Sequence, residues 1–201
     1  MPVETRRIGD FGHKRGFALV ARTFNRGDVR GKTLVFTGAK EEDAAFIVSL
    51  RLAKGQYLSA TSPAVADQVA WLRRYAAKSD EAYFIIRSLE AESLGVVRLY
   101  DPQGESFCWG SWILKDGAPA SAAIESALMV YQIALGMGFT RSHFEVDRHN
   151  EKVWTFHERF GAKRVRASDR EYFYEIDKHA ILLALERYAK FIAQLGHSSP
   201  K

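Results

Sequence analysis

The sequence has few of the features that would place it outside the ordinary globular proteins. It contains a single cysteine, Cys108, so both an internal disulfide and a thiolate cluster around a metal ion are excluded. The longest apolar run near the N-terminus spans only residues 17–21, too short for a signal-peptide core or a membrane span. Internal repeats and low-complexity segments are also lacking. We therefore expect a metal-free cytoplasmic protein with no membrane partner.

What the sequence does contain is typical of one folded domain. Its 201 residues are 47% hydrophobic and 26% charged, and a chain of this length buries roughly 70% of its unfolded surface. Basic residues outnumber acidic ones over residues 1–32, which carry much of the net charge of +5. Such an arm can attract nucleic acid or an anionic nucleotide. Because aromatic residues alternate with the basic ones only loosely, we expect a solvated arm and no nucleic-acid partner.

Hydrophobic periodicity predicts alternating strands and helices after the arm. The predicted strands span residues 33–37, 82–89, 94–100, 105–114, 141–147, 163–166 and 171–176. The predicted helices span residues 41–52, 62–78, 121–136, 150–161 and 178–195. Ser62 is expected to cap the second helix, with a proline after it in the first turn. This order predicts an α/β domain, with helices and strands mixed in the α+β manner around one layered sheet.

Two added segments flank the predicted domain. We place a basic arm at residues 1–32, the α/β domain at residues 33–177 and a C-terminal helix at residues 178–201. The helix carries an apolar stripe made of Ile181, Leu185, Tyr188, Ile192 and Leu195. A stripe with this spacing packs on the body of its own chain or zips to a second copy in a homodimer, and packing on the body is favoured.

A strand that leads into a short helix is the most informative stretch of the chain. Residues 144–161 read FEVDRHNEKVWTFHERFG, in which Asn150 opens an amphipathic helix that Gly161 closes. Val153, Phe156 and His157 fall on one face of that helix, so a histidine lies inside an otherwise apolar seam. A strand aimed at a helix N-terminus, with a polar residue in the seam, indicates a ligand site.

This stretch carries a motif that resembles the GNAT superfamily of acetyl-CoA-dependent N-acetyltransferases. The motif N-x-x-[AV]-x-x-[LF]-[YH]-E-[KR]-[LF]-G is met by Asn150, Val153, Phe156, His157, Glu158, Arg159, Phe160 and Gly161. The resemblance covers about residues 33–177 and implies a GNAT-like acyl-CoA N-acyltransferase fold. The segments AWLRRY, AYFII, LGVVRLYD and FHERFGAKRV look similar to a branch that acetylates amino groups of nucleotide-linked sugars.

The resemblance implies acetyl-CoA as co-substrate, held where the sheet splays between residues 105–114 and 141–147. The implied binding positions are Trp112, Ile113, Leu114, Gly117, Ala118, Ser121, Ala122, Ala123, Asn150 and Val153. The pyrophosphate belongs over the loop that enters the helix at residues 121–136, where free N–H groups favour negative charge. The family signature there, [QR]-x-x-G-x-[GA], is altered in this chain, which leaves open a relative that no longer binds acetyl-CoA.

Acetyl transfer needs a neutral amine, a polarised carbonyl and a protonated leaving thiolate. His157 stands where many relatives carry a tyrosine for the last task, and an imidazole can donate a proton or a hydrogen bond to sulfur. The alternative for His157 is a satisfied core histidine. Glu145 is the candidate base, or else a solvated strand residue.

Four further residues are candidates for the acceptor pocket: Tyr83, Arg98, Tyr100 and Trp109. Arg98 is expected to pair with an acceptor phosphate, and strand alternation places Trp109 and Trp112 on opposite faces. The sequence thus predicts transfer of an acetyl group from acetyl-CoA to a primary amine of a small acceptor, with a nucleotide-linked amino sugar as first choice. Two alternatives stay open: acetylation of a protein N-terminus or lysine, and a non-catalytic acyl-CoA-binding or interaction module.

Overall fold

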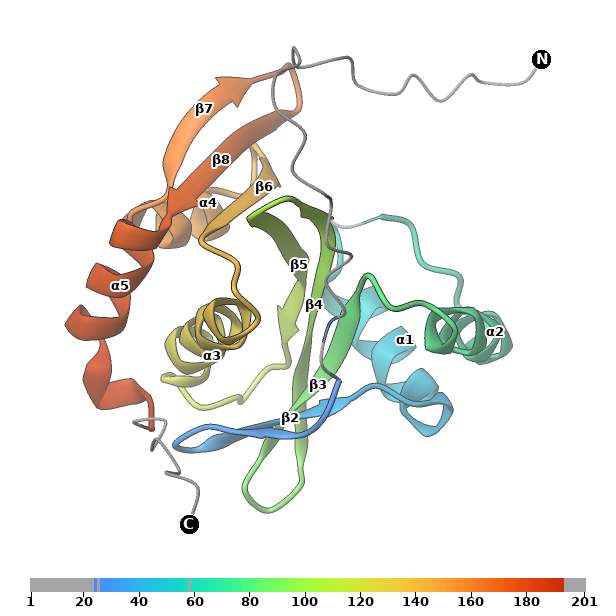
Figure 1. Cartoon of the computed structure of the whole chain (residues 1–201). Coiled ribbons are helices and arrows are strands. Elements are labelled where there is room, and N and C mark those ends of the chain that lie inside the picture. The colour runs from blue at the N-terminus through green and yellow to red at the C-terminus, as the bar shows by residue number, and fades with distance from the viewer. Residues whose placement is uncertain (1–23, 25, 58, 194–201) are drawn as a thin grey trace.

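A sheet of eight strands forms the centre of this computed structural model, which describes residues 24, 26–57 and 59–193 (Figure 1). The strands lie in the order β1-β2-β3-β4-β5-β6-β8-β7. Their bounds are β1 Val29–Arg30, β2 Leu34–Gly38, β3 Ala82–Ser88, β4 Ser93–Gln103, β5 Ser106–Leu114, β6 Arg141–Asp147, β7 Lys163–Ala167 and β8 Glu171–Asp177. Neighbours are antiparallel except β5 and β6, which run parallel and are joined through a crossover helix.

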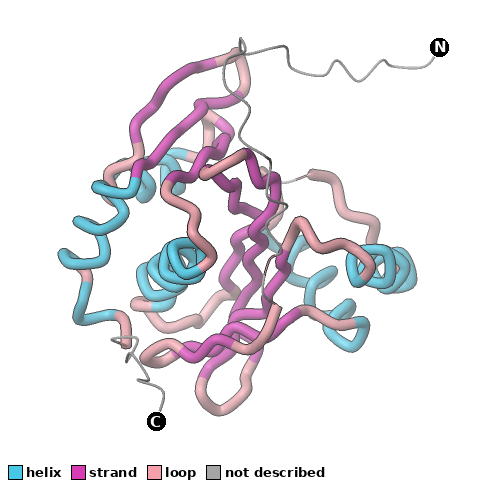
Figure 2. The backbone as a smooth tube through the Cα atoms, viewed as in Figure 1, coloured by secondary structure: helices cyan, strands magenta, loops and turns pink. Residues whose placement is uncertain are grey.

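Helices cover both faces of the sheet (Figures 1 and 2). On one face lie α1 (Ala44–Lys54) and α2 (Val65–Ala76), whose apolar sides pack on β3, β4 and β5. On the other face lie α3 (Ala122–Gly136), α4 (Glu151–Arg159) and α5 (Lys178–Arg187). Short 3-10 turns occupy Glu41–Asp43 and Ala189–Phe191. The predicted mixed α/β fold is confirmed. Among the described residues, every helix is too short or too polar to cross a membrane.

Two helix boundaries differ from the prediction. Helix α2 begins at Val65, so Ser62 is not its cap; the Ser62 hydroxyl instead donates to Asp67 Oδ2 at 2.6 Å and accepts from the Ala64 N–H at 3.2 Å. Helix α5 ends at Arg187, well before the predicted residue 195, because the backbone leaves the helical region at Tyr188. Most of the predicted arm, residues 1–23 and residue 25, lies outside the described residues, as do residues 194–201.

Buried contacts fix α3 and α5 on the body of the domain. Glu125 of α3 is 1% exposed, and its Oε1 accepts hydrogen bonds from the backbone N–H groups of Thr33 at 2.7 Å and Leu34 at 3.1 Å. In α5, Ile181 is buried in the main core. These contacts hold the N-terminal turn of α3 in a defined place relative to the sheet, which matters for the site described next.

Candidate functional site

The parallel strands β5 and β6 separate soon after they pair, and the separation opens a cleft in the sheet. They are paired only at Ser106–Arg141 and Phe107–Ser142, near the start of each strand. Beyond these pairs β5 stays with β4, and β6 stays with β8. The facing edges of the two strands therefore leave backbone N–H and C=O groups available to a ligand.

The cleft between β5 and β6 holds about 90 Å³. It is lined by Tyr57, Trp109, Gly110, Ser111, Trp112, Phe144, Glu145, Val146, Asp147, Asn150, Val153 and His157. Five residues that the sequence singled out for donor binding or chemistry meet here: Trp112, Glu145, Asn150, Val153 and His157.

A β-bulge in β5 shapes the wall of the cleft. Gly110 and Ile113 pair with β4 residues that are only two positions apart, so β5 carries one extra residue. At the bulge Ser111 has a φ of 48°, in the left-handed region that residues with a side chain avoid. The bulge turns Trp112 onto the face of Trp109, and their ring centroids lie 5.5 Å apart. The prediction of opposite faces was therefore wrong, because alternation holds only along an unbroken strand.

His157 lies beneath these tryptophans, with only 5% of its surface exposed. Its ring centroid is 5.1 Å from that of Trp109 and 4.3 Å from that of Phe144. Burial lowers the pKa of the imidazole to about 3, so the ring is neutral near pH 7. Its Nδ1 has no hydrogen-bond partner within the part of the chain that the structure describes. A buried unpartnered nitrogen costs about 1–3 kcal/mol, so this histidine is not satisfied by the protein alone.

Asn150 stands at the N-terminus of α4 without using its side chain to cap the helix. Its backbone carbonyl accepts from the Val153 N–H at 3.0 Å, but its amide group makes no capping hydrogen bond. Asn150 therefore occupies the N-cap position, as predicted, but its side chain does not cap the helix. An amide that the helix does not use is free to bind a ligand in the cleft, beside the half-buried Val153.

The loop into α3 offers backbone donors at the end of β5. Gly117 has a φ of 77°, which turns the chain toward the helix. Ser121 is the N-cap of α3, yet its side chain makes no capping hydrogen bond. The Ala122 N–H already donates to the Pro119 carbonyl at 2.9 Å, so the amide of Ala123, next in the first helical turn, is the one that remains available to an anion. Ala118 is half-buried in this loop, and Ala122 is fully buried, so only small side chains stand between solvent and the helix end.

The remaining predicted donor-binding residues, Ile113 and Leu114, lie at the end of β5 and pair with β4. Ile113 is 7% exposed and packs in the core under α1 and α2, and Leu114 is half-buried on the opposite core. Neither side chain lines the cleft. Only their backbone can serve the role that the resemblance implies.

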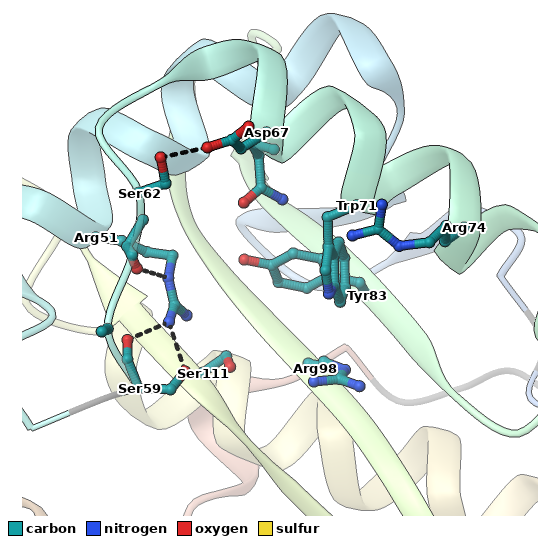
Figure 3. A pocket seen from close by; sticks show the side chains of 12 residues that line it. Arg51, Ser59, Ser62, Asp67, Trp71, Arg74, Tyr83, Arg98 and Ser111 are labelled. Carbon is teal, nitrogen blue, oxygen red and sulfur yellow. Dashed lines mark hydrogen bonds between the residues drawn. The ribbon is translucent and has the colours of Figure 1, made fainter. Parts of the chain in front are cut away.

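A second cavity of about 300 Å³ lies on the face of the sheet that α1 and α2 cover (Figure 3). It is lined by Arg51, Ser59, Ala60, Thr61, Ser62, Asp67, Gln68, Trp71, Arg74, Tyr83, Arg98 and Ser111. Ser111 lines both this cavity and the cleft, so the two spaces meet at the bulge. The structure thus brings together a cleft with an aromatic inner wall and a polar cavity at one residue with a positive φ.

The predicted acceptor residues divide between these two spaces. Tyr83 and Arg98 line the cavity, and burial raises the pKa of Tyr83 to about 12, so its hydroxyl keeps its proton. Trp109 lines the cleft instead. Tyr100 lines neither; the Arg98 guanidinium lies 4.8 Å from its ring centroid. The guanidinium of Arg98 also forms an ion pair with Glu81, which is 2% exposed.

The loop between α1 and α2 closes one side of the cavity and is tied down by Arg51. The Arg51 Nε donates to Thr61 Oγ1 at 2.6 Å, and its Nη2 donates to the Ser59 carbonyl at 2.9 Å (Figure 3). Both partners are neutral oxygens, so the loop is held without a carboxylate opposite the guanidinium.

Glu145 projects from β6 on the face that carries the cavity and reaches the rim of the cleft. Partial burial raises the pKa of its carboxyl, and the nearby Glu171 charge adds to the rise, whereas Arg166 and His143 oppose it. Cys108, on the neighbouring strand, is buried, and burial raises the pKa of its thiol to about 12. A carboxylate with a raised pKa is a stronger base than an ordinary one, while a neutral buried thiol is inert.

Sequence reasoning missed most of the cavity. Arg51, Trp71, Arg74 and Ser111 were not singled out, because helical periodicity shows which side of a helix is apolar but not which residues its rim presents to a distant strand. The segment AWLRRY in α2 contains Trp71 and Arg74, but its resemblance did not assign a role to either residue. No group of three or more histidine, cysteine or acidic side chains among the described residues is arranged to hold a metal ion.

Comparison with known proteins gives the same family from sequence and from structure. A model of the family described as "Acetyltransferase (GNAT) domain" matches residues 33–163. A solved structure described as "Apo FdhC- a nucleotide-linked sugar GNAT" is similar with a TM-score of 0.76 and 34% identity, over 84% of this chain and 100% of that chain. No curated protein matches the chain.

Two more distant structures show the fold alone. A GCN5-related N-acetyltransferase from Brucella melitensis has a TM-score of 0.69 and 16% identity, covering 83% of this chain and 85% of that chain. A mutant of the spermidine N-acetyltransferase SpeG from Vibrio cholerae has a TM-score of 0.64 and 12% identity, covering 75% of this chain and 96% of that chain.

Proposed function

Because the chain belongs to the GNAT acetyltransferase family, we propose that it moves an acetyl group from acetyl-CoA to a primary amine of a small acceptor, an amino sugar linked to a nucleotide. The observation that carries this proposal is the meeting of two different spaces at Ser111. A transferase needs a donor site and an acceptor site that share one reacting point. The FdhC structure, described as a nucleotide-linked sugar GNAT, supports the acceptor class.

The residues of the cleft fit the thioester arm of acetyl-CoA. The edges of β5 and β6 offer unpaired backbone groups for the amides of the arm, and Asn150 offers a free side-chain amide. The uncapped first turn of α3 suits the pyrophosphate, since small residues leave its N–H groups accessible. The altered phosphate-loop signature therefore keeps the physical requirement for binding, although the signature residues differ.

The proposed reaction forms one C–N bond and breaks one C–S bond. Glu145 takes the amine proton, directly or through water, and the neutral amine attacks the thioester carbonyl carbon. Backbone N–H groups near the bulge stabilise the charge that develops on the carbonyl oxygen. The bond to sulfur then breaks beside His157, and the excess proton on the attacking nitrogen passes through water to the leaving thiolate, which gives the amide and the free thiol of CoA.

His157 acts in this scheme as a hydrogen-bond donor and not as an acid. Burial holds its pKa at about 3, so a protonated imidazole is not available near neutral pH. A neutral ring still carries one N–H, and the unpartnered Nδ1 shows that the protein leaves hydrogen-bonding capacity unused in this pocket. The acidic role considered from the sequence is therefore replaced by a weaker one.

A donor-binding test combined with an acceptor panel examines the proposal. Acetyl-CoA at a hundredfold excess over its dissociation constant should stabilise the protein by about 2.7 kcal/mol. Thiol release should follow with nucleotide-linked amino sugars and be slower with free amino sugars, amino acids and peptides. Binding without thiol release for any acceptor would favour a non-catalytic module, and release with peptides alone would favour a protein acetyltransferase. No stabilisation by any acyl-CoA would contradict the proposal as a whole.

A further inference from the structure

We propose that Arg74 of α2 binds the phosphate groups of the acceptor, at the end of the cavity away from the reacting amine. The inference rests on the proposed function, because it assigns one part of the acceptor to one part of the same cavity. It also moves the phosphate contact away from Arg98, the residue that the sequence favoured. The reasons lie in the charges that line the cavity.

Arg98 already has an anionic partner inside the protein. Its guanidinium pairs with the carboxylate of Glu81, which is 2% exposed, and lies 5.3 Å from the ring centroid of Trp71. Glu81 also pairs with Lys78 at 2.8 Å, so drawing Arg98 away to a ligand would remove one of the two cations that neutralise a buried carboxylate, which is costly. The positive charge of Arg98 therefore serves to neutralise Glu81 inside the protein.

Arg51 has no carboxylate opposite it, but its Nε and Nη2 are engaged by the loop. Two of its nitrogen atoms donate to Thr61 and Ser59 of the loop that closes the cavity. The carboxylate of Asp67, the only acidic side chain in the cavity lining, accepts from Ser62 at 2.6 Å. Arg51 therefore contributes positive charge to the cavity while its hydrogen bonds fix the loop.

Arg74 is the cation in the cavity lining for which the structure shows no ion pair and no side-chain hydrogen bond among the described residues. It lies in the last turn of α2 and is exposed. Figure 3 shows its guanidinium reaching alongside Trp71, toward the interior of the cavity. A free guanidinium held at the rim of a polar cavity is suited to bidentate recognition of phosphate oxygens.

The positions of Ser111, Trp71 and Arg74 define how the acceptor is oriented in the cavity. The amine must approach Ser111, where the cavity meets the cleft. Trp71 lies on α2 one turn before Arg74 and presents an aromatic surface beside Tyr83, with their ring centroids 5.7 Å apart. An acceptor with an amine at one end, a ring in the middle and phosphate at the other end matches this sequence of groups.

The test compares Arg74→Gln with Arg73→Gln, a matched control one residue away. Arg73 is also exposed and on α2, but it pairs with Glu41 at 2.9 Å and does not line the cavity. Both variants lose one positive charge from the same helix. Neither side chain is buried, so thermal melts of both should stay close to that of the unchanged protein.

The first readout is the binding of uridine diphosphate and thymidine diphosphate to protein saturated with CoA, which keeps these anions out of the α3 site. Arg74→Gln should weaken the binding about tenfold or more, and Arg73→Gln by less than about twofold, because only Arg74 contacts the phosphates. The difference should shrink as salt is raised. Equal effects of the two substitutions would overturn the assignment.

The second readout is the KM for a nucleotide-linked amino sugar compared with the same amino sugar without phosphate. Arg74→Gln should raise the KM of the phosphate-bearing acceptor about tenfold and leave the KM of the other and both kcat values unchanged. If the unchanged protein acetylates the nucleotide-linked sugar and Arg74→Gln does not alter its KM, the assignment of Arg74 fails and the proposed function stands. If the unchanged protein acetylates no nucleotide-linked sugar, the proposed acceptor fails, and the assignment fails with it.

Discussion

The cleft between β5 and β6 and the cavity under α1 and α2 are built from different kinds of residues. Aromatic rings and a neutral histidine form the inner wall of the cleft, with Glu145, Asp147 and Asn150 beside them, whereas arginines, hydroxyl groups and Asp67 line the cavity. A low-dielectric cleft protects a thioester and strengthens the backbone donors around it. A charged cavity selects its ligand by polar groups. On the function that we propose, the cleft serves the acyl donor and the cavity serves the acceptor.

The largest effect is expected where the two spaces meet. Ser111→Val should reduce kcat/KM for acetyl transfer by about 100-fold or more, because a β-branched residue resists the positive φ of 48° and a flattened bulge misplaces the reacting groups. Ser111→Gly accepts the same backbone and should stay within a few-fold of the unchanged enzyme. If valine and glycine behaved alike, the bulge would not be what joins the two spaces.

The next effect concerns Glu145, at the rim of the cleft. Glu145→Gln should lower kcat/KM by about 100-fold, since general bases typically contribute at least that much. The raised pKa of Glu145 should place the acidic limb of the pH–rate profile above the usual carboxyl range, and the substitution should remove that limb. Retention of the limb in Glu145→Gln would assign the base to another group.

A smaller effect on kcat is expected for His157, at the inner wall of the cleft. His157→Ala should lower kcat about tenfold, with little change in the affinity for acetyl-CoA, because a hydrogen bond to the leaving sulfur matters chiefly in the transition state. His157→Asn keeps an N–H donor of smaller size and should recover part of the rate. Unchanged turnover in both variants would remove His157 from the mechanism.

The last prediction concerns stability and leaves the cavity untouched. The pKa of His157 is about 3 in the folded chain and 6.5 as its ordinary value, so the unfolded chain binds a proton that the folded chain does not. Stability from this group is complete above pH 6.5 and falls by about 1.4 kcal/mol per pH unit as the pH drops below it. Urea unfolding at several pH values should show this slope in the unchanged protein and its loss in His157→Phe. Equal slopes in the two proteins would contradict the neutral, buried state.

The comparison also explains what the sequence could predict. Asn150, Val153 and His157 are spaced by helical periodicity in one short segment, so local sequence places them in the cleft together. Gly110 stands directly before Ser111, but a glycine inside a strand does not by itself show that a residue is inserted, so alternation gave the wrong face for Trp112. The predicted cap at Ser62 failed because α2 begins at Val65 with Ala64 as its N-cap, so the Ser62 hydroxyl stands two residues too early and bonds to the Ala64 N–H and the Asp67 side chain.

The cavity was harder to predict because it is assembled from distant segments. Arg51, Trp71, Arg74 and Ser111 come from two helices and a strand, and their meeting depends on how α1 and α2 sit on the sheet. Arg98 lines the cavity, but Glu81, the buried carboxylate that pairs with it, lies before β3 and 17 residues away in the sequence. Charge partners across a sheet follow from tertiary packing, which periodicity within one segment does not contain.

The most direct test of the cleft as the donor site is a crystal structure of the protein with bound CoA. We expect the pantetheine arm to lie between β5 and β6, with the CoA sulfur beside Ser111 and His157 and the CoA pyrophosphate over residues 117–123. CoA bound anywhere else, with the edges of β5 and β6 free of ligand, would contradict the assignment of the cleft as the donor site.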